Sequence, residues 1–160
     1  MNEVELTSEL MISLIEGMQD KKKSIDSFYM KYDSDYPMRK DVERKFKRVI
    51  DEINSIFPES IKGTQFRRTP LFYSLFLAIA HRLFGVPNVN LAGGGVKSLS
   101  SPEREKFKTT IESLSNIITD ARADEPVGGH NTAFVTASLS QTDNIRPRQT
   151  RLRTIYNRAF

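Results

Sequence analysis

The chain of 160 residues contains no cysteine, which excludes disulfide bridges, thiolate metal ligands and a cysteine nucleophile. It has only two histidines, His81 and His130, and neither has a partner at the His-x-x-x-His spacing typical of zinc sites. No apolar run is long enough for a transmembrane helix, and the acidic start of the chain is unlike a signal peptide. We therefore expect a cytoplasmic protein with no membrane contact, no cofactor and no bound metal.

The most apolar segment of the chain, residues 67–85, predicts a buried helix at the centre of the fold. Thr69 is a candidate N-cap, and Pro70 suits the first helical position because the N–H that it lacks would have no helical partner. Gly85 can adopt the left-handed conformation that ends a helix. Between these ends apolar residues occupy nearly every face, so the helix must be covered on all sides.

Apolar residues at three- and four-residue spacing predict further helices around this central one. No segment alternates with the period of two that is typical of a strand. The expected helices cover about residues 3–18, 22–32, 38–57, 69–85, 101–121, 131–139 and 147–159. The sequence therefore predicts a single all-α domain over residues 1–160, a bundle of six to seven helices around a buried central helix.

Several local patterns add finer expectations. The helix over residues 22–32 is expected to bury Tyr29 among its aromatic side chains, and residues 33–37 form a turn by composition. Ser101 is expected to cap the helix that follows it. The glycines at positions 93–95 predict a mobile loop. They do not form a phosphate-binding loop, because the Gly-x-x-x-x-Gly-Lys frame and a preceding strand are both missing.

No catalytic constellation emerges from the remaining residues. His81, inside the central helix, is interpreted as a structural side chain, and His130 as a residue that caps the next helix. Arg122 and His130 are separated by seven residues that include Pro126 and two glycines. This spacing does not support the arginine–histidine pair of helical ribonucleases of the HEPN type.

Clustered arginine is the strongest functional signal. The net charge is +4, and the last fifteen residues hold five arginines and no acidic residue. Arginine offers a planar fork that suits phosphate oxygens, so we expect an anionic partner, with nucleic acid as the first candidate. The candidate nucleic-acid-binding residues are Arg146, Arg148, Arg151, Arg153 and Arg158, together with Arg67 and Arg68 before the central helix. Arg148, Arg151 and Arg158 can share one helix face, with the arginines outward. The alternative is that these arginines pair with acids on the helices over 38–57 and 101–121.

Three parts of the chain resemble the helical C-terminal half of GmrSD-type restriction proteins, which carry a ParB-like N-terminal domain. The resemblance covers essentially the whole chain and rests on short, structural motifs. Those parts are residues 5–17 with 19–26, the block from Phe66 to Phe76, and Thr142-Asp143-Asn144 followed by the arginines at 146, 148 and 151.

The resemblance implies a bacterial defence protein that restricts foreign or modified DNA. The Asp-Gly-Gln-Gln-Arg type motif of the nucleotide-hydrolysing domain is absent here, as is a His-Asn-His nuclease domain, so no catalytic residue is implied. We expect either the C-terminal part of a longer protein or a stand-alone helical half, not itself an enzyme. It would contact DNA backbone or the ParB-like nucleotidase domain, in cis or in trans. The alternatives are a purely structural interaction or homo-oligomerisation domain and, third, a small independent nuclease.

Overall fold

The computed structural model describes residues 3–32 and 38–160, and every regular element in these ranges is helical. The predicted turn over residues 33–37, with its acid pair Asp33 and Asp35, lies outside them. Short 3-10 turns, η1 (Ile61–Gly63), η2 (Gln65–Arg67) and η3 (Gly129–Asn131), lie between the longer helices. The α-helices are α1 (Glu3–Glu16), α2 (Lys21–Tyr32), α3 (Arg39–Ile56), α4 (Thr69–Phe84), α5 (Ser101–Arg122), α6 (Thr132–Leu139) and α7 (Ile145–Ala159). The all-α prediction is confirmed.

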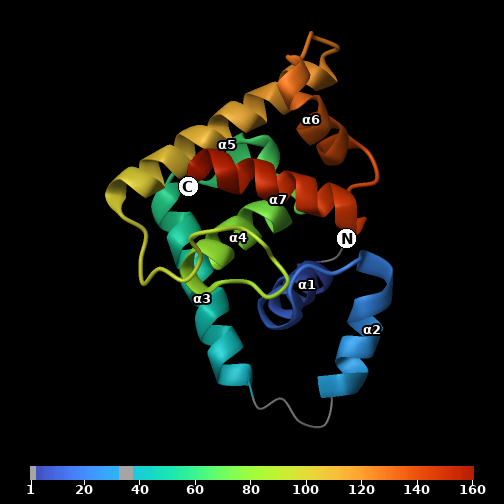
Figure 1. Ribbon diagram of the computed structural model, residues 1–160, viewed down its shortest axis with the longest axis vertical. Helices are drawn as coiled ribbons and strands as arrows, with labels where there is room; N and C mark the ends of the chain where they lie inside the picture. The colour runs from blue at the N-terminus through green and yellow to red at the C-terminus, as the bar shows by residue number, and fades with distance from the viewer. Residues whose placement is uncertain (1–2, 33–37) are drawn as a thin grey trace.

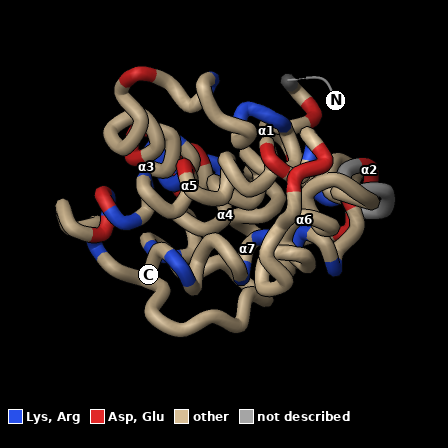
Figure 2. The backbone as a smooth tube through the Cα atoms, turned by 90° about the horizontal axis from the view of Figure 1, so that it is seen from above, with Lys and Arg blue, Asp and Glu red and all other residues tan. Residues whose placement is uncertain are grey.

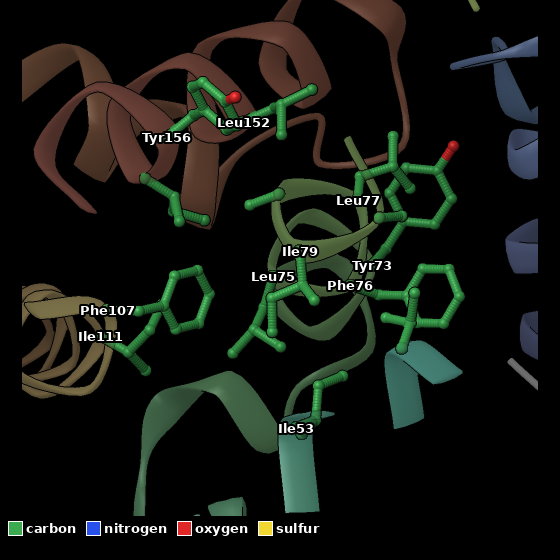
Figure 3. Packing of buried hydrophobic residues seen from close by; sticks show 14 of the residues in the cluster. Ile53, Tyr73, Leu75, Phe76, Leu77, Ile79, Phe107, Ile111, Leu152 and Tyr156 are labelled. Carbon is green, nitrogen blue, oxygen red and sulfur yellow. The ribbon is translucent and has the colours of Figure 1, made fainter. Parts of the chain in front are cut away.

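Helix α4 is the centre of the bundle, as its composition predicts. Its residues from Tyr73 to His81 are all buried. Helices α1, α3 and α7 pack directly on it, and α5 packs over α7 (Figure 1). In the core, Leu75 and Ile79 of α4 lie on the side that faces Phe107 and Ile111 of α5 (Figure 3). Burial of this many large apolar side chains is the main source of stability, since each contributes roughly 1.5–3 kcal/mol on transfer from water.

Two glycines end helices, and Gly85 does so at the position that the sequence predicts. Gly17 follows α1 with a φ of 84°, and Gly85 follows α4 with a φ of 71°, both in the left-handed region. At Gly17 a Cβ atom would lie 2.0 Å from the carbonyl oxygen of Pro87. A side chain is therefore excluded at Gly17 both by its backbone conformation and by the close approach of the segment after α4.

The predicted N-cap residues of two helices are each wrong by one position. Thr69 is already helical, and Arg68, with an extended backbone, takes the N-cap position of α4 without a side-chain bond. Helix α5 is capped by Ser100 rather than Ser101. The Ser100 side chain accepts from the Glu103 N–H, and Glu103 accepts in return from the Ser100 N–H, which completes a capping box. Reciprocal bonding with Glu103 requires a serine three residues earlier, and only Ser100 stands there.

Helix α2 lies at the periphery, where α1 is its main packing partner. Tyr29 was expected to be buried, but it is 51% exposed, and Met30 is 77% exposed. The Tyr29 hydroxyl instead shares a hydrogen bond of 2.7 Å with the hydroxyl of Ser8 on α1. The aromatic periodicity of this segment identified a helix correctly, but it did not identify the face that is covered.

The capping assignment predicts different effects for two adjacent serines. We expect Ser100→Ala to lower the free energy of unfolding by about 0.5–2 kcal/mol, because it removes the N-cap side chain of α5. Ser101→Ala, one position inside the helix, serves as the matched control and should change stability by less than about 0.5 kcal/mol. Urea denaturation followed by circular dichroism measures both. A larger loss for Ser101→Ala than for Ser100→Ala would contradict the assignment.

Candidate nucleic-acid interface

The structure divides the arginines of α7 into an interior group and an exposed group. Arg148 is 3% exposed and Arg151 is fully buried. Arg146 and Arg153 are exposed, and Arg158 is half-buried, donating to the Asn131 Oδ1 at 2.7 Å. Arg148, Arg151 and Arg158 do share one side of the helix, as their spacing predicts. That side packs inward, however, so the expectation that these arginines point outward is wrong for Arg148 and Arg151.

Arg148 joins three helices in the interior. Its Nη2 lies 2.9 Å from the Glu9 Oε2 of α1, and its Nη1 donates to the Gln19 carbonyl oxygen at 3.3 Å. The guanidinium carbon lies 4.3 Å from the ring centroid of Tyr73 on α4, in cation–π geometry. The acidic partner of Arg148 therefore comes from the first helix, and not from the third or fifth.

Arg151 is held by neutral groups on three segments. Its Nε donates to the Ser74 Oγ at 2.9 Å, its Nη1 to the Ala137 carbonyl at 2.6 Å, and its Nη2 to the Thr142 carbonyl at 2.8 Å. Burial lowers the pKa of Arg151 to about 10, and the positive charge of Arg148 acts in the same direction. Because this value is still well above neutrality, the guanidinium remains charged inside the protein.

Arg67 and Arg68 lie at the start of α4. Arg67 is exposed, whereas Arg68 is half-buried, and its Nη1 has no hydrogen-bond partner among the described residues. Burial lowers the pKa of Arg68, and the positive charge of Arg122 lowers it further. These two candidates therefore belong to the corner formed by η2, α4 and the end of α5, rather than to α7.

The outward side of α7 forms the arginine face, defined here as Arg146, Gln149, Thr150, Arg153 and Asn157. At about 100° per residue these five positions span about 100° of the helix surface. Among the described residues, no carboxylate lies within ion-pair distance of Arg146 or Arg153, and α7 itself contains no acidic residue. Figure 2 shows the arginines of α7 in blue and no Asp or Glu along this helix. By contrast, Arg44, Lys45 and Lys47 on the surface of α3 are paired with acids of the same helix.

A cavity of about 300 Å³ adjoins the arginine face. We call it the α7 cavity. The segment after α1, the loop after α4 and one side of α7 form its walls. It is lined by Met18, Asn88, Val89, Asn90, Leu91, Ile145, Gln149, Leu152 and Arg153. The residues that line it are widely separated in the sequence, and among them only Arg153 was a candidate binding residue from the sequence.

The loop that forms one wall of this cavity, residues 85–100, passes between α7 and α1 (Figure 1). His81 fixes its first half, because its Nδ1 accepts from the Val86 N–H at 3.0 Å. The proton must then be on Nε2, which lies 2.9 Å from the Leu91 carbonyl oxygen and donates to it. Both ring nitrogens of His81 are thus used in the fold, in agreement with its structural interpretation.

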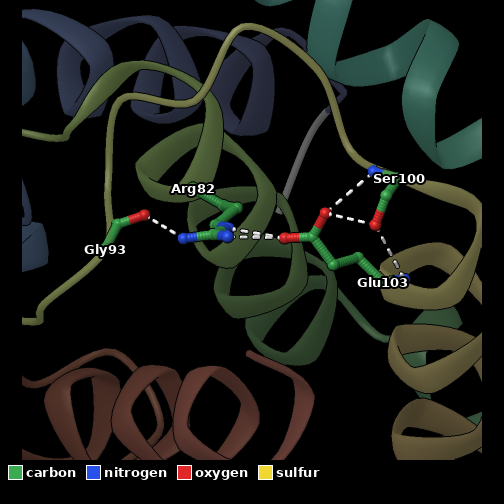
Figure 4. A network of polar contacts seen from close by, with 4 residues as sticks. All are labelled: Arg82, Gly93, Ser100 and Glu103. Carbon is green, nitrogen blue, oxygen red and sulfur yellow. Dashed lines mark hydrogen bonds and ion pairs between the residues drawn. The ribbon is translucent and has the colours of Figure 1, made fainter.

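The glycine-rich half of the same loop is held by Arg82. The Arg82 carbonyl oxygen accepts from the N–H groups of Gly95 and Val96, each at 3.0 Å. The Nη1 of the Arg82 side chain donates to the Gly93 carbonyl oxygen (Figure 4). A Cβ atom on Gly94 would lie 2.7 Å from the His81 carbonyl oxygen. The glycines predicted a mobile connector, but here they allow the backbone to pack closely on α4.

The same Arg82 side chain also reaches the start of α5. Its Nη2 lies 2.6 Å from the Glu103 Oε1, and the other Glu103 oxygen accepts from the Ser100 hydroxyl at 2.7 Å and from the Ser100 N–H at 2.8 Å. The bonds from Ser100, followed by Arg82, lower the pKa of Glu103 to about 2 from an ordinary value of 4.5.

No known protein family, curated protein or solved structure gives a significant match to the chain. The resemblance to GmrSD-type proteins therefore stays a prediction. In the part of the chain that the structure describes, no helix is long and apolar enough to cross a membrane. No group of three or more His, Cys, Asp or Glu side chains in that part is placed to hold a metal ion.

The Glu103 contacts predict a defined dependence of stability on pH. Because the folded pKa lies below the unfolded value, the stabilisation is fully present above pH 4.5 and is lost as the pH falls toward 2. Denaturation of the native protein and of Glu103→Gln across this range measures it. We expect the native protein to be the more stable of the two above pH 4.5, and the difference to shrink on acidification. A difference that stays constant with pH would contradict the account.

Proposed function

We propose that this chain is a non-catalytic helical module that binds the phosphate backbone of nucleic acid through the arginine face of α7, with DNA as the first candidate ligand. The observation that carries the proposal is the exposure of Arg146 and Arg153 on one side of a helix with no acidic partner. They are seven residues apart, or about 10.5 Å along the helix axis. Two guanidinium groups at this separation can each bind a different phosphate of one backbone.

The resemblance to GmrSD-type proteins supplies the proposed setting, a bacterial DNA-restriction or phage-defence system. In that setting the module would hold DNA for a ParB-like nucleotidase domain, supplied in cis or in trans. The interior arginines would have no part in the contact. Their role would be to position α7 so that Arg146 and Arg153 face outward.

A second candidate is a protein-interaction or oligomerisation domain, and helix α2 favours it. Tyr29 and Met30 are exposed there, and Val4 of the neighbouring α1 is 64% exposed. Exposed apolar side chains that gather on one region of a surface are typical of protein–protein contacts. The two candidates use different surfaces of the molecule, so variants of α2 and of α7 separate them.

The proposal predicts a salt-dependent affinity for duplex DNA. Binding of a labelled duplex, followed by fluorescence anisotropy, should weaken linearly in log K against log salt concentration. Arg146→Ala and Arg153→Ala should each weaken binding to any sequence and reduce the salt slope by about 0.9, the value for one lost phosphate contact.

Arg44→Ala on α3 is the matched control, since it removes the same charge from an exposed arginine that is paired with Asp41. It should leave the salt slope unchanged. Absence of binding at low salt would overturn the proposal. An equal effect of Arg44→Ala would show that net charge, and not the arginine face, determines the affinity.

A further inference from the structure

The α7 cavity and the arginine face share residues, and this suggests what the cavity binds. Gln149 and Arg153 both line the cavity and belong to the outward side of α7. A molecule whose anionic group is bound by Arg153 therefore has the cavity next to it. Of the described surface hollows, the one at Arg146, between α6 and α7, is lined largely by small and hydroxyl side chains and is more open to solvent than the α7 cavity.

The walls of the α7 cavity suit a flat, largely apolar group with polar edges. Its apolar lining comes from Met18, Ile145, Leu152 and the loop residues Val89 and Leu91. The side chains of Asn90 and Gln149 supply amides, each of which both donates and accepts hydrogen bonds. The volume of about 300 Å³ is at the small end of the roughly 300–1,000 Å³ range of ligand pockets. A single heterocycle meets these requirements.

The cavity is formed before any ligand arrives. Its loop wall is fixed to α4 by the bond between the His81 Nε2 and the Leu91 carbonyl. It is fixed to α1 by the Asn88 side chain, which donates to the Glu16 carbonyl at 3.1 Å. A ligand therefore does not need to order this wall, and binding avoids that entropic cost.

We infer that the α7 cavity accepts one unstacked base of a nucleic-acid strand whose adjoining phosphate is bound by Arg153. The inference rests on the proposed function and adds to it a preference for strands that are single or locally unpaired. A base within a duplex is covered by its neighbours and its partner, so it reaches a protein cavity only after it leaves the stack. The paired donors and acceptors of Asn90 and Gln149 bind base edges without selecting one base.

The test compares two single strands that have the same length and backbone charge, one of which carries normal bases and the other abasic sites. Fluorescence anisotropy at fixed low salt should give about tenfold tighter binding for the strand with bases, the size expected for one well-packed base. A 2-aminopurine in the first strand reports unstacking directly. Because the protein contains no tryptophan, its intrinsic fluorescence interferes little, and we expect the signal to rise on binding.

Gln149→Phe fills the cavity from an exposed helical position and should abolish both the tenfold preference and the rise in 2-aminopurine signal. Gln149→Ala leaves the volume open and should retain most of the preference. Arg44→Ala should leave the preference unchanged. Circular dichroism and thermal unfolding of each variant confirm that the helices are intact before binding is compared.

The outcomes separate this inference from the proposed function. Equal binding of both strands, sensitive to Arg146→Ala and Arg153→Ala, would overturn the base site and leave backbone binding in place. A preference for bases that persists in Gln149→Phe would also overturn the site. If neither strand binds at low salt, the proposed function fails, and the base site fails with it.

Discussion

The arrangement of this protein depends on two arginines of α7 that lie in the interior. Arg151 donates to side-chain and backbone oxygens of α4, α6 and the following turn, and Arg148 pairs with Glu9 of α1. A buried charge is costly unless its hydrogen bonds are satisfied, so these contacts allow essentially one rotation of α7 about its axis. That rotation places Leu152 and Ile155 in the core and leaves Arg146 and Arg153 outside.

Helix α4 connects the core to the candidate site. Helix α4 is covered on every side, and its last turn uses His81 and Arg82 to hold the loop that follows. The loop in turn forms the wall opposite α7, so the cavity lies between two elements that are both fixed to α4. The polar groups of the last turn thus position a surface feature, while the rest of the helix supplies apolar packing.

The sequence predicted the elements of the fold well, because amphipathic period and helix-ending glycines are local properties. It correctly indicated that α4 is buried on all sides and that His81 is structural. It did not reveal which arginines of α7 turn inward, since Arg148 and Arg153 look alike until Glu9 and Tyr73 are brought beside the helix. The cap at Ser100 and the exposure of Tyr29 depend on single contacts that periodicity does not encode. The α7 cavity escaped prediction because its walls come from residues 18, 88–91 and 145–153, which only the tertiary fold brings together.

The most direct test of the account compares the free energies of unfolding of Arg151→Met and Arg153→Met, measured by urea denaturation under identical conditions. Both substitutions replace an arginine of the same helix, two residues apart, with an apolar side chain of similar length. The account predicts a loss of at least about 2 kcal/mol for Arg151→Met, because the Ala137 and Thr142 carbonyls lose buried donors. Arg153→Met should change stability by less than about 0.5 kcal/mol. Equal effects of the two substitutions, or a larger loss at Arg153, would contradict the inward placement of Arg151 on which the rest depends.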